Sequence, residues 1–234
     1  MSSVPRKNHF KAGVLSTSGV EAVRSKGVLS TAGDQRVGVN PRTEMVHATE
    51  WRSDPSAPIP LGETVGFAPG GRDQRAYEAH DEDCAVFTSA PLAEPVEWTG
   101  MVRAELEVMS TGRDTDVVVR VCDVYPDGRS MLVVEYAQRA RYREGFEKQV
   151  LMEPDEPTSI AFDIGWCSIT FAAGHKIRVV VSSTGDPLYE ANAHQDGSEM
   201  TVEPPPGGGL AVTNTLLHGG RCVSKIIAPV VPIG

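Results

Sequence analysis

Residues 114–131 constrain the fold of this chain more than any other stretch, because they join a strand to a tight turn. The strand is rich in β-branched residues, which suit extended backbone, and successive side chains alternate between its two faces. One face carries Val117, Val119 and Val121, and the other carries Val118, Arg120 and Cys122. At 126–128, proline presets φ, aspartate bonds to nearby backbone and glycine accepts positive φ. The segment therefore predicts a β-hairpin.

Patterns that predict strands recur at short intervals on both sides of this hairpin in the sequence. In residues 98–109 apolar and charged side chains alternate, which predicts one buried face and one wet face. Further strands are predicted at residues 85–88, 131–142, 159–164, 176–182, 210–217 and 223–231. These strands occur with almost no helical periodicity, which predicts an all-β protein. Closed barrels and double sheets manage so many strand edges, so we expect a jelly-roll β-sandwich.

The first part of the chain has a different composition. Residues 1–79 are rich in Ser, Thr, Gly, Pro and Arg and show no sustained periodicity. We interpret residues 1–79 as an irregular, extended N-terminal segment or connector, and we expect the jelly-roll domain to span residues 80–234. The pentapeptide GVLST occurs twice, which is fewer than the about three units that a repeat fold needs.

Charge and apolar content limit the class of partner. A net charge of −9 argues against a general nucleic-acid binder, because phosphate charge must be offset by a basic surface. The same charge argues against docking on an anionic membrane. The Met1 end has no apolar leader, and no apolar run approaches the ~18 residues that a membrane span requires. We therefore expect a cytoplasmic protein.

The cysteines and histidines do not form a metal-binding pattern. The cysteines, at positions 84, 122, 167 and 222, are far apart in the sequence, and no two histidines have metal-ligand spacing. We interpret the cysteines as small buried side chains in a reducing cytosol. His175 is expected to be a turn residue bonded to nearby backbone, and His80 lies in an acidic stretch that is typical of a solvated face. No metal or cofactor is predicted.

Candidate catalytic groups are few. The chain lacks a G-x-S-x-G nucleophile elbow, and Ser130, in the sequence GRSML, is interpreted as a turn serine. Asp114 and Asp116 share a strand face and could perform acid–base chemistry. We favour a structural role, in which they pair with arginines of the next strand. The candidate partners are Arg139, Arg141 and Arg143. No residue of this chain is therefore predicted to be catalytic.

Two segments in order resemble a known family. FTSAPLAEPVEWTG at 87–100, followed by DTDVVVRVCDVYPDGRSM at 114–131, resembles the C-terminal jelly-roll domain of the CocE/NonD hydrolases. This is the X-Pro dipeptidyl-peptidase-like group, which includes cocaine esterases and α-amino acid ester hydrolases. Later segments fit too, and the resemblance covers about residues 50–232. They are residues 139–149, 171–183, 214–218 and 226–232.

The resemblance implies a galactose-binding-like β-sandwich from an enzyme that hydrolyses acyl esters or peptides. In that family the Ser-His-Asp triad stands in an N-terminal α/β-hydrolase domain, and no motif of that domain occurs in this chain. Whether this chain is itself an enzyme therefore stays open. We expect a non-catalytic module, either a gene fragment or a separately encoded half, that partners a hydrolase domain or subunit. A homodimer is also possible.

Two other functions are compatible with a jelly roll. A stand-alone module could bind carbohydrate or a protein partner, and a row of exposed aromatic side chains on one sheet would favour it. A cupin-like metal enzyme would need clustered histidines, which the sequence lacks.

Overall fold

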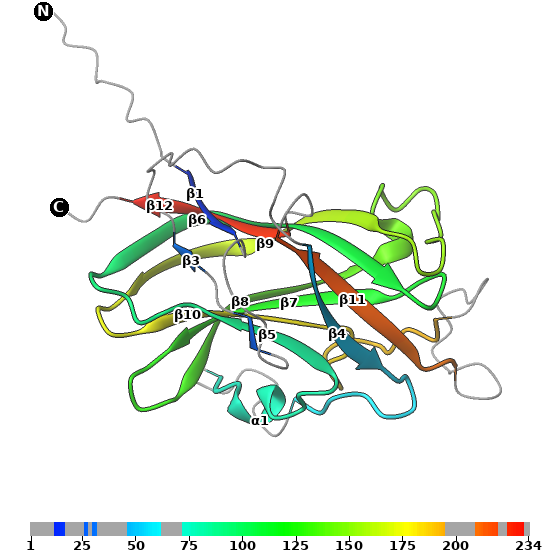
Figure 1. The fold of residues 1–234 in the computed structure, drawn as a ribbon, viewed down its shortest axis with the longest axis horizontal. Coiled ribbons are helices and arrows are strands. Elements are labelled where there is room, and N and C mark those ends of the chain that lie inside the picture. Colours follow the sequence, from blue (N-terminus) through cyan, green and yellow to red (C-terminus); the bar gives the residue numbers. More distant parts are fainter. Residues whose placement is uncertain are drawn as a thin grey trace, which may run out of the picture.

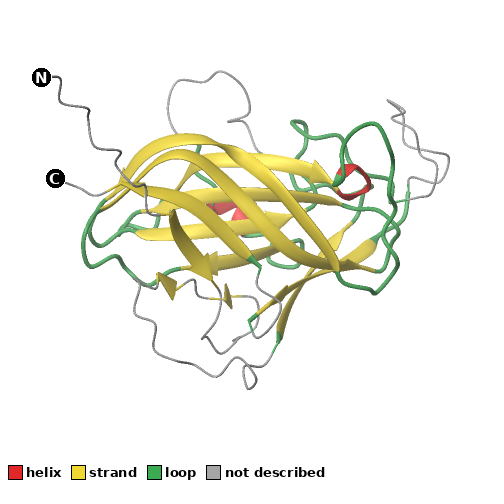
Figure 2. Ribbon diagram, turned by 90° about the horizontal axis from the view of Figure 1, so that it is seen from above, coloured by secondary structure: helices red, strands yellow, loops and turns green. Residues whose placement is uncertain are grey.

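The computed structural model describes residues 46–61, 72–194, 209–219 and 224–231, together with the backbone of three short N-terminal strands. Two sheets are stacked as a β-sandwich (Figure 1), which confirms the predicted all-β class. Figure 2 shows how little of the described chain is helical. The helical segments are α1 (Arg75–Glu78) and the 3-10 turn η1 (Ala140–Tyr142).

The larger sheet, sheet A, has the strand order β3-β1-β12-β6-β11-β4, and β9 pairs with the other edge of β6. Its strands are β1 (Ala12–Ser16), β3 (Ser30–Thr31), β4 (His47–Ser53), β6 (Val96–Ser110), β9 (Thr158–Phe171), β11 (Val212–His218) and β12 (Lys225–Val231). Sheet B has the order β2-β5-β10-β7-β8. Its strands are β2 (Lys26–Gly27), β5 (Cys84–Thr88), β7 (Asp116–Val124), β8 (Ser130–Arg139) and β10 (Lys176–Ser182).

The core lies between the sheets and consists of the inward side chains that the alternating patterns predict. Along β6 the apolar side chains at positions 98, 102, 104, 106 and 108 are buried, and the charged side chains at positions 103, 105 and 107 are exposed or half-buried. The largest buried core side chains include Trp51, Trp98, Phe87, Phe171 and Met152. Burying each such side chain contributes about 1.5–3 kcal/mol, so the inward face of each strand determines the stacking of the sheets.

The predicted hairpin forms as β7 and β8, and its register has a direct chemical consequence. Gly128 in the turn has a φ of +91°, which glycine adopts without strain. The antiparallel pairing places Arg139 directly opposite Asp116. A register shift in the middle of β7 lies between this pair and the turn. Cross-strand partners of opposite charge attract, so the charge pair favours the register beyond the shift.

Both faces of β7 are buried, which differs from an ordinary two-layer sandwich. All nine residues of β7 are buried, and the Arg120 side chain is 0% exposed. A third layer covers the outer face of sheet B and packs on Val180 of β10. It includes Tyr77 of α1 and Ile59, which lies in the segment after β4. The Arg120 guanidinium lies 3.9 Å from the centroid of the Tyr77 ring. The polar face of the hairpin therefore supports a further layer instead of meeting water.

Two strands differ from the prediction: β9 is longer than expected, and β4 lies in the segment that was predicted to be irregular. Strand β9 continues seven residues past Ile164, through Gly165 to Phe171, where the sequence shows no clean alternation. A register shift between Val102 and Arg103 of β6 interrupts the pairing near this point. Strand β4 lies within residues 1–79 and pairs along its whole length with β11. The bounds of the two predicted domains stay predictions.

Residues 184–194, which we call the strap, cross the outer side of sheet B. The backbone N–H of Asp186 donates to the carbonyl of Ile59 at 3.1 Å, and the N–H of Leu61 donates to the carbonyl of Asp186 at 2.9 Å. Hydrogen bonds therefore hold the first part of residues 185–209, and the part from 195 to 208 lies outside the described residues.

Candidate functional site

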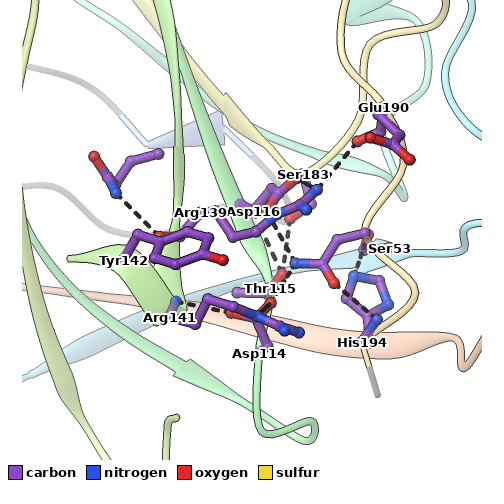
Figure 3. A network of polar contacts seen from close by, with 12 residues as sticks. Ser53, Asp114, Thr115, Asp116, Arg139, Arg141, Tyr142, Ser183, Glu190 and His194 are labelled. Atoms are coloured by element: carbon purple, nitrogen blue, oxygen red, sulfur yellow. Dashed lines mark hydrogen bonds and ion pairs between the residues drawn. The ribbon is translucent and has the colours of Figure 1, made fainter. Parts of the chain in front are cut away.

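Polar side chains gather at one end of the sandwich, where β7 begins and β8 ends (Figure 3). We call them the polar cluster. Its members are Ser53, Asp114, Thr115, Asp116, Arg139, Arg141, Ser183, Asn192 and His194. Nearly all are buried. Buried polar groups are tolerated only when they are paired, so the hydrogen bonds of each member decide what the cluster can do.

Each aspartate of the cluster is held by an arginine, as the sequence predicts. The backbone N–H of Arg141 donates to Asp114 Oδ1 at 2.8 Å, and its Nε donates to Oδ2 at 2.7 Å. Arg139 donates from Nε to Asp116 Oδ1 at 2.9 Å and from Nη2 to Asp116 Oδ2 at 3.1 Å. Arg143, the third candidate, instead donates to the backbone carbonyls of Ala140 and Val150. The two carboxylates are therefore charge-paired.

Asn192 of the strap bridges the two aspartates. Its Nδ2 donates to Asp114 Oδ2 at 2.7 Å and to Asp116 Oδ1 at 2.9 Å. Its Oδ1 accepts from the backbone N–H of His194 at 2.9 Å. Burial raises the pKa of Asp116, and this outweighs the opposing effects of Arg139 and Asn192. The hydrogen bonds of the cluster therefore hold the strap in place.

Ser53 and His194 contact each other as the serine and histidine of a catalytic triad do, but the other ring nitrogen of His194 has no carboxylate partner. Ser53 Oγ lies 3.2 Å from His194 Nε2, and both residues are about 98% buried. His194 Nδ1 lies 2.6 Å from the carbonyl oxygen of Leu210, where a catalytic triad has a carboxylate. Burial lowers the pKa of His194, so the imidazole is neutral near pH 7. A hydroxyl this deeply buried offers no access to a substrate.

Ser183 links the cluster to sheet A. Its Oγ accepts from Trp51 Nε1 at 2.9 Å and from Asn214 Nδ2 at 3.0 Å, and both donors stand on sheet A. Thr115 Oγ1 is 3.4 Å away. Because Ser183 directly follows β10 of sheet B, these bonds tie the two sheets together at the end that carries the cluster.

The remaining candidates from the sequence also have structural partners. Ser130 is buried, and its Oγ donates to Glu78 Oε1 at 2.5 Å. His175 was expected to bond to backbone, and this expectation is wrong for its ring: Nδ1 lies 2.8 Å from Asp123 Oδ1. The antiparallel pairing of β10 with β7 brings Asp123 next to the turn of His175, a contact that sequence distance conceals.

Neither a metal-binding group nor a thiol of lowered pKa occurs among the described residues. In the described part of the chain no three His, Cys, Asp or Glu side chains are grouped to hold a metal ion. Burial raises the pKa of Cys84 to about 12 and also raises the pKa of Cys122, so both thiols stay protonated. No described helix is both long and apolar enough to cross a membrane.

Sequence reasoning missed Ser53, Ser183, Asn192 and His194 as members of the cluster. They come from three segments with no shared motif. One local signal exists only in the structure: His194 has a φ of +57°, a conformation that non-glycine residues adopt rarely.

Comparison with known proteins now decides the family. Residues 40–227 match the family described as the X-Pro dipeptidyl-peptidase C-terminal non-catalytic domain. The chain belongs to this family. The match confirms the resemblance of the two segments at 87–100 and 114–131, and it agrees with a site whose carboxylates are all paired and whose hydroxyls are buried.

Individual relatives point to the same group of enzymes. The cocaine esterase of Rhodococcus sp. (strain MB1 Bresler) is 38% identical over 185 residues, which are 76% of this chain and 31% of that protein. The solved structure of an α-amino acid ester hydrolase superposes with a TM-score of 0.76 at 26% identity, and it covers 95% of this chain and 36% of that one.

A second solved structure shows the fold alone. An aminopeptidase from a marine sediment Thaumarchaeota archaeon superposes with a TM-score of 0.78 at 24% identity, over 95% of this chain and 37% of that one. This X-Pro dipeptidyl-peptidase C-terminal-type chain therefore spans about a third of the length of the relatives described here.

Proposed function

We propose that this chain is the non-catalytic β-sandwich of an ester-hydrolysing serine hydrolase, and that the nucleophilic serine stands on a separate α/β-hydrolase domain or subunit. The observation that carries the proposal is the family match over residues 40–227, to a domain described as non-catalytic. The 38% identity to a cocaine esterase favours an ester over an X-Pro peptide as the substrate class.

The geometry of the polar cluster supports a non-catalytic role. Asp114 and Asp116 are neutralised by arginines, so neither is a free general base. The one described serine hydroxyl that faces a cluster imidazole, that of Ser53, is about 98% buried. Covalent catalysis needs a nucleophile that reaches the substrate and a base that an orienting group positions. The cluster meets neither requirement.

A reducing compartment, the cytoplasm, is part of the proposal. Three cysteines of the described residues, Cys84, Cys122 and Cys167, are free thiols. Free buried thiols are typical of proteins that fold in reducing surroundings.

A fluorophosphonate probe and a p-nitrophenyl ester assay test the proposal. The purified chain is expected to show no covalent labelling of any serine and no turnover. The control is the Rhodococcus cocaine esterase, which must be labelled under the same conditions. Stoichiometric serine labelling together with turnover by this chain alone would overturn the proposal.

Carbohydrate binding is the second candidate, and the structure gives it little support. Among the described residues the exposed aromatic side chains are Tyr136, Phe146 and Trp166, which belong to β8, a loop and β9. They form no row on one sheet face. A stacking platform for a chain of sugars would require such a row.

A further inference from the structure

The pentapeptide GVLST occurs twice in the chain, at residues 13–17 and again at residues 27–31. The first copy supplies most of β1, whereas the second copy is divided between β2 and β3. Both copies precede residue 40, where the match to the non-catalytic domain family begins. The family match and the proposed function therefore do not account for them.

Strand β1 lies on the outer edge of β12 in sheet A (Figure 1). The pairing is antiparallel and joins residues 12–16 to residues 225–229, while the other edge of β12 pairs with β6. A sheet edge presents unpaired N–H and C=O groups, and an extended segment adds to such an edge chiefly through main-chain hydrogen bonds. We call the outer edge of residues 225–229 the strand slot.

The second pentapeptide copy matches the strand slot almost as fully as the first. If residues 26–30 occupied the slot in the direction of β1, they would place the same Gly-Val-Leu-Ser sequence opposite residues 225–228. Of the five paired positions only one would change, because Lys26 would stand opposite Pro229 in place of Ala12. Equal main-chain bonding and equal residues at four positions give the two copies similar affinities for the slot.

The connection to β4 permits either copy to fill the slot. Ser16, at the end of β1, is opposite Lys225, which pairs with Glu105 of β6. Strand β4 begins beside the end of β11, which pairs with β6 as far as Glu107. The slot and the start of β4 therefore lie at the same part of β6. Residues 31–46 would make the connection from the second copy, and such a segment spans up to about 50 Å when extended.

The terms that distinguish the two occupants are small. Residues 31–46 form a connection about half as long as residues 17–46, and halving a loop favours its closure by about 0.6 kcal/mol. Against this, the second copy would give up the two-residue ladders of β2 with β5 and of β3 with β1. It must also reverse direction, since β3 is antiparallel to β1 and hence parallel to β12. The exchange therefore requires β1 to leave the slot first.

We infer that the strand slot is a binding surface for an extended Gly-Val-Leu-Ser strand, and that residues 12–16 and residues 26–30 are its interchangeable occupants. With the first copy bound, β1, β2 and β3 are all paired with the sheets. With the second copy bound, the chain before residue 26 is released from sheet A. The occupant of the slot thus decides how much of the N-terminal segment the sandwich holds.

Paired proline substitutions test the inference, because proline lacks the N–H that a strand donates. Two successive positions are changed, so that one of the lost N–H groups faces β12 in either orientation. The variants are Val14→Pro, Leu15→Pro for the first copy and Val28→Pro, Leu29→Pro for the second. Hydrogen–deuterium exchange with mass spectrometry measures the protection of the slot amides, and the buried strand β7 is the internal control for folding.

Each paired variant should retain most of the protection of the slot, because the other copy replaces the one that was changed. The variant with all four prolines should exchange several-fold faster at the slot, while β7 stays protected. If the first-copy variant alone loses as much protection as the four-proline variant, the inference is wrong. Full protection in the four-proline variant would also overturn it, because neither copy would then be needed.

Disulfide trapping provides a second measurement that leaves both strands able to pair. Directly opposite residues of antiparallel strands have Cα atoms about 4.5–5.5 Å apart, which suits a disulfide. Ile227 is opposite Val14 in the structure and would be opposite Val28 after the exchange. Ile227→Cys is therefore combined with either Val14→Cys or Val28→Cys.

The trapping experiment is done in a background that carries Cys167→Ser and Cys222→Ser, and Val20→Cys, between the two copies, replaces the slot cysteine in the control. Under mild oxidation both slot pairs should form a disulfide several-fold faster than the control pair, as read by mass spectrometry of peptides. A Val28→Cys pair that forms no faster than the control, beside a Val14→Cys pair that does, would overturn the inference whatever the proline variants show.

Discussion

Arg141 holds Asp114 by two hydrogen bonds, one from its backbone N–H at 2.8 Å and one from Nε at 2.7 Å, and the two side chains are 2% and 0% exposed. The aspartate precedes β7 and the arginine belongs to η1, just after β8. The pair therefore closes the open end of the hairpin, and Asn192 of the strap donates a hydrogen bond to the same aspartate.

Removing one partner of this buried pair should be costly. Asp114→Ala leaves the Arg141 guanidinium buried without its carboxylate, and breaking a buried pair in this way costs about 3–5 kcal/mol. The control is Asp163→Ala, which removes an exposed pair with Arg103 and should cost less than about 1 kcal/mol. Urea denaturation of both variants measures the free energy of unfolding. Equal losses would contradict the structural role of Asp114.

Asn192 should be sensitive to charge more than to size. Asn192→Ala removes two hydrogen bonds to carboxylates, each worth about 1.5–3 kcal/mol before relaxation. Asn192→Asp keeps the shape but places a third carboxylate beside Asp114 and Asp116. We expect the aspartate variant to be the less stable of the two at pH 7 and to recover part of its stability near pH 4, as measured by urea denaturation. A more stable aspartate variant at pH 7 would show that Asn192 does not bridge the aspartates.

His194 and His218 should make the protein less stable as the pH falls below neutral. Burial lowers the pKa of both groups. Between the lowered pKa of the folded protein and the unfolded pKa of about 6.5, the unfolded chain binds more protons than the folded one. The free energy of unfolding therefore rises with pH across this window, and stability is lost as the pH falls through it. The double variant His194→Gln, His218→Gln should therefore show a flatter dependence between about pH 5 and pH 7. Asp116 is present in both proteins and interacts electrostatically with His194, so the comparison measures the two histidines together with that interaction.

Ser183 should contribute more than an ordinary serine. Ser183→Ala leaves the N–H of Trp51 and the amide of Asn214 buried without their acceptor, at a cost of about 1–3 kcal/mol for a buried unsatisfied group. Ser168→Ala, on the exposed face of β9, serves as the control and should be nearly neutral. Thermal unfolding of the two variants distinguishes them, and an unchanged midpoint for Ser183→Ala would contradict its role as a tie between the sheets.

The cysteines should differ in reactivity between the folded and unfolded states. Burial raises the pKa of Cys84 to about 12 and raises that of Cys122 as well, and the thiolate is the reactive form. Iodoacetamide at pH 8 should leave both unmodified in the folded protein and label both in urea, as read by mass spectrometry. Rapid labelling of Cys122 without urea would mean that the third layer over sheet B opens readily.

Much of the fold could be predicted because it depends on local patterns. Alternation along residues 98–109 indicates β6 and its buried face, and the Pro-Asp-Gly turn indicates the hairpin. The register shift between Val121 and Cys122 has no such local signal. The pairing of Asp114 and Asp116 with Arg139 and Arg141 could also be predicted, since a hairpin brings its two ends together. Strand β4 was not predicted, because its exposed positions interrupt the apolar pattern.

The sequence by itself determined most of the strands, the hairpin and the family, since each of these is encoded within a short stretch. The tertiary structure alone decided that both faces of β7 are buried and that Ser53, Asn192 and His194 meet at the aspartates. These contacts join segments up to 141 residues apart. Their partners are selected by the stacking of two sheets and a third layer, which no local pattern records.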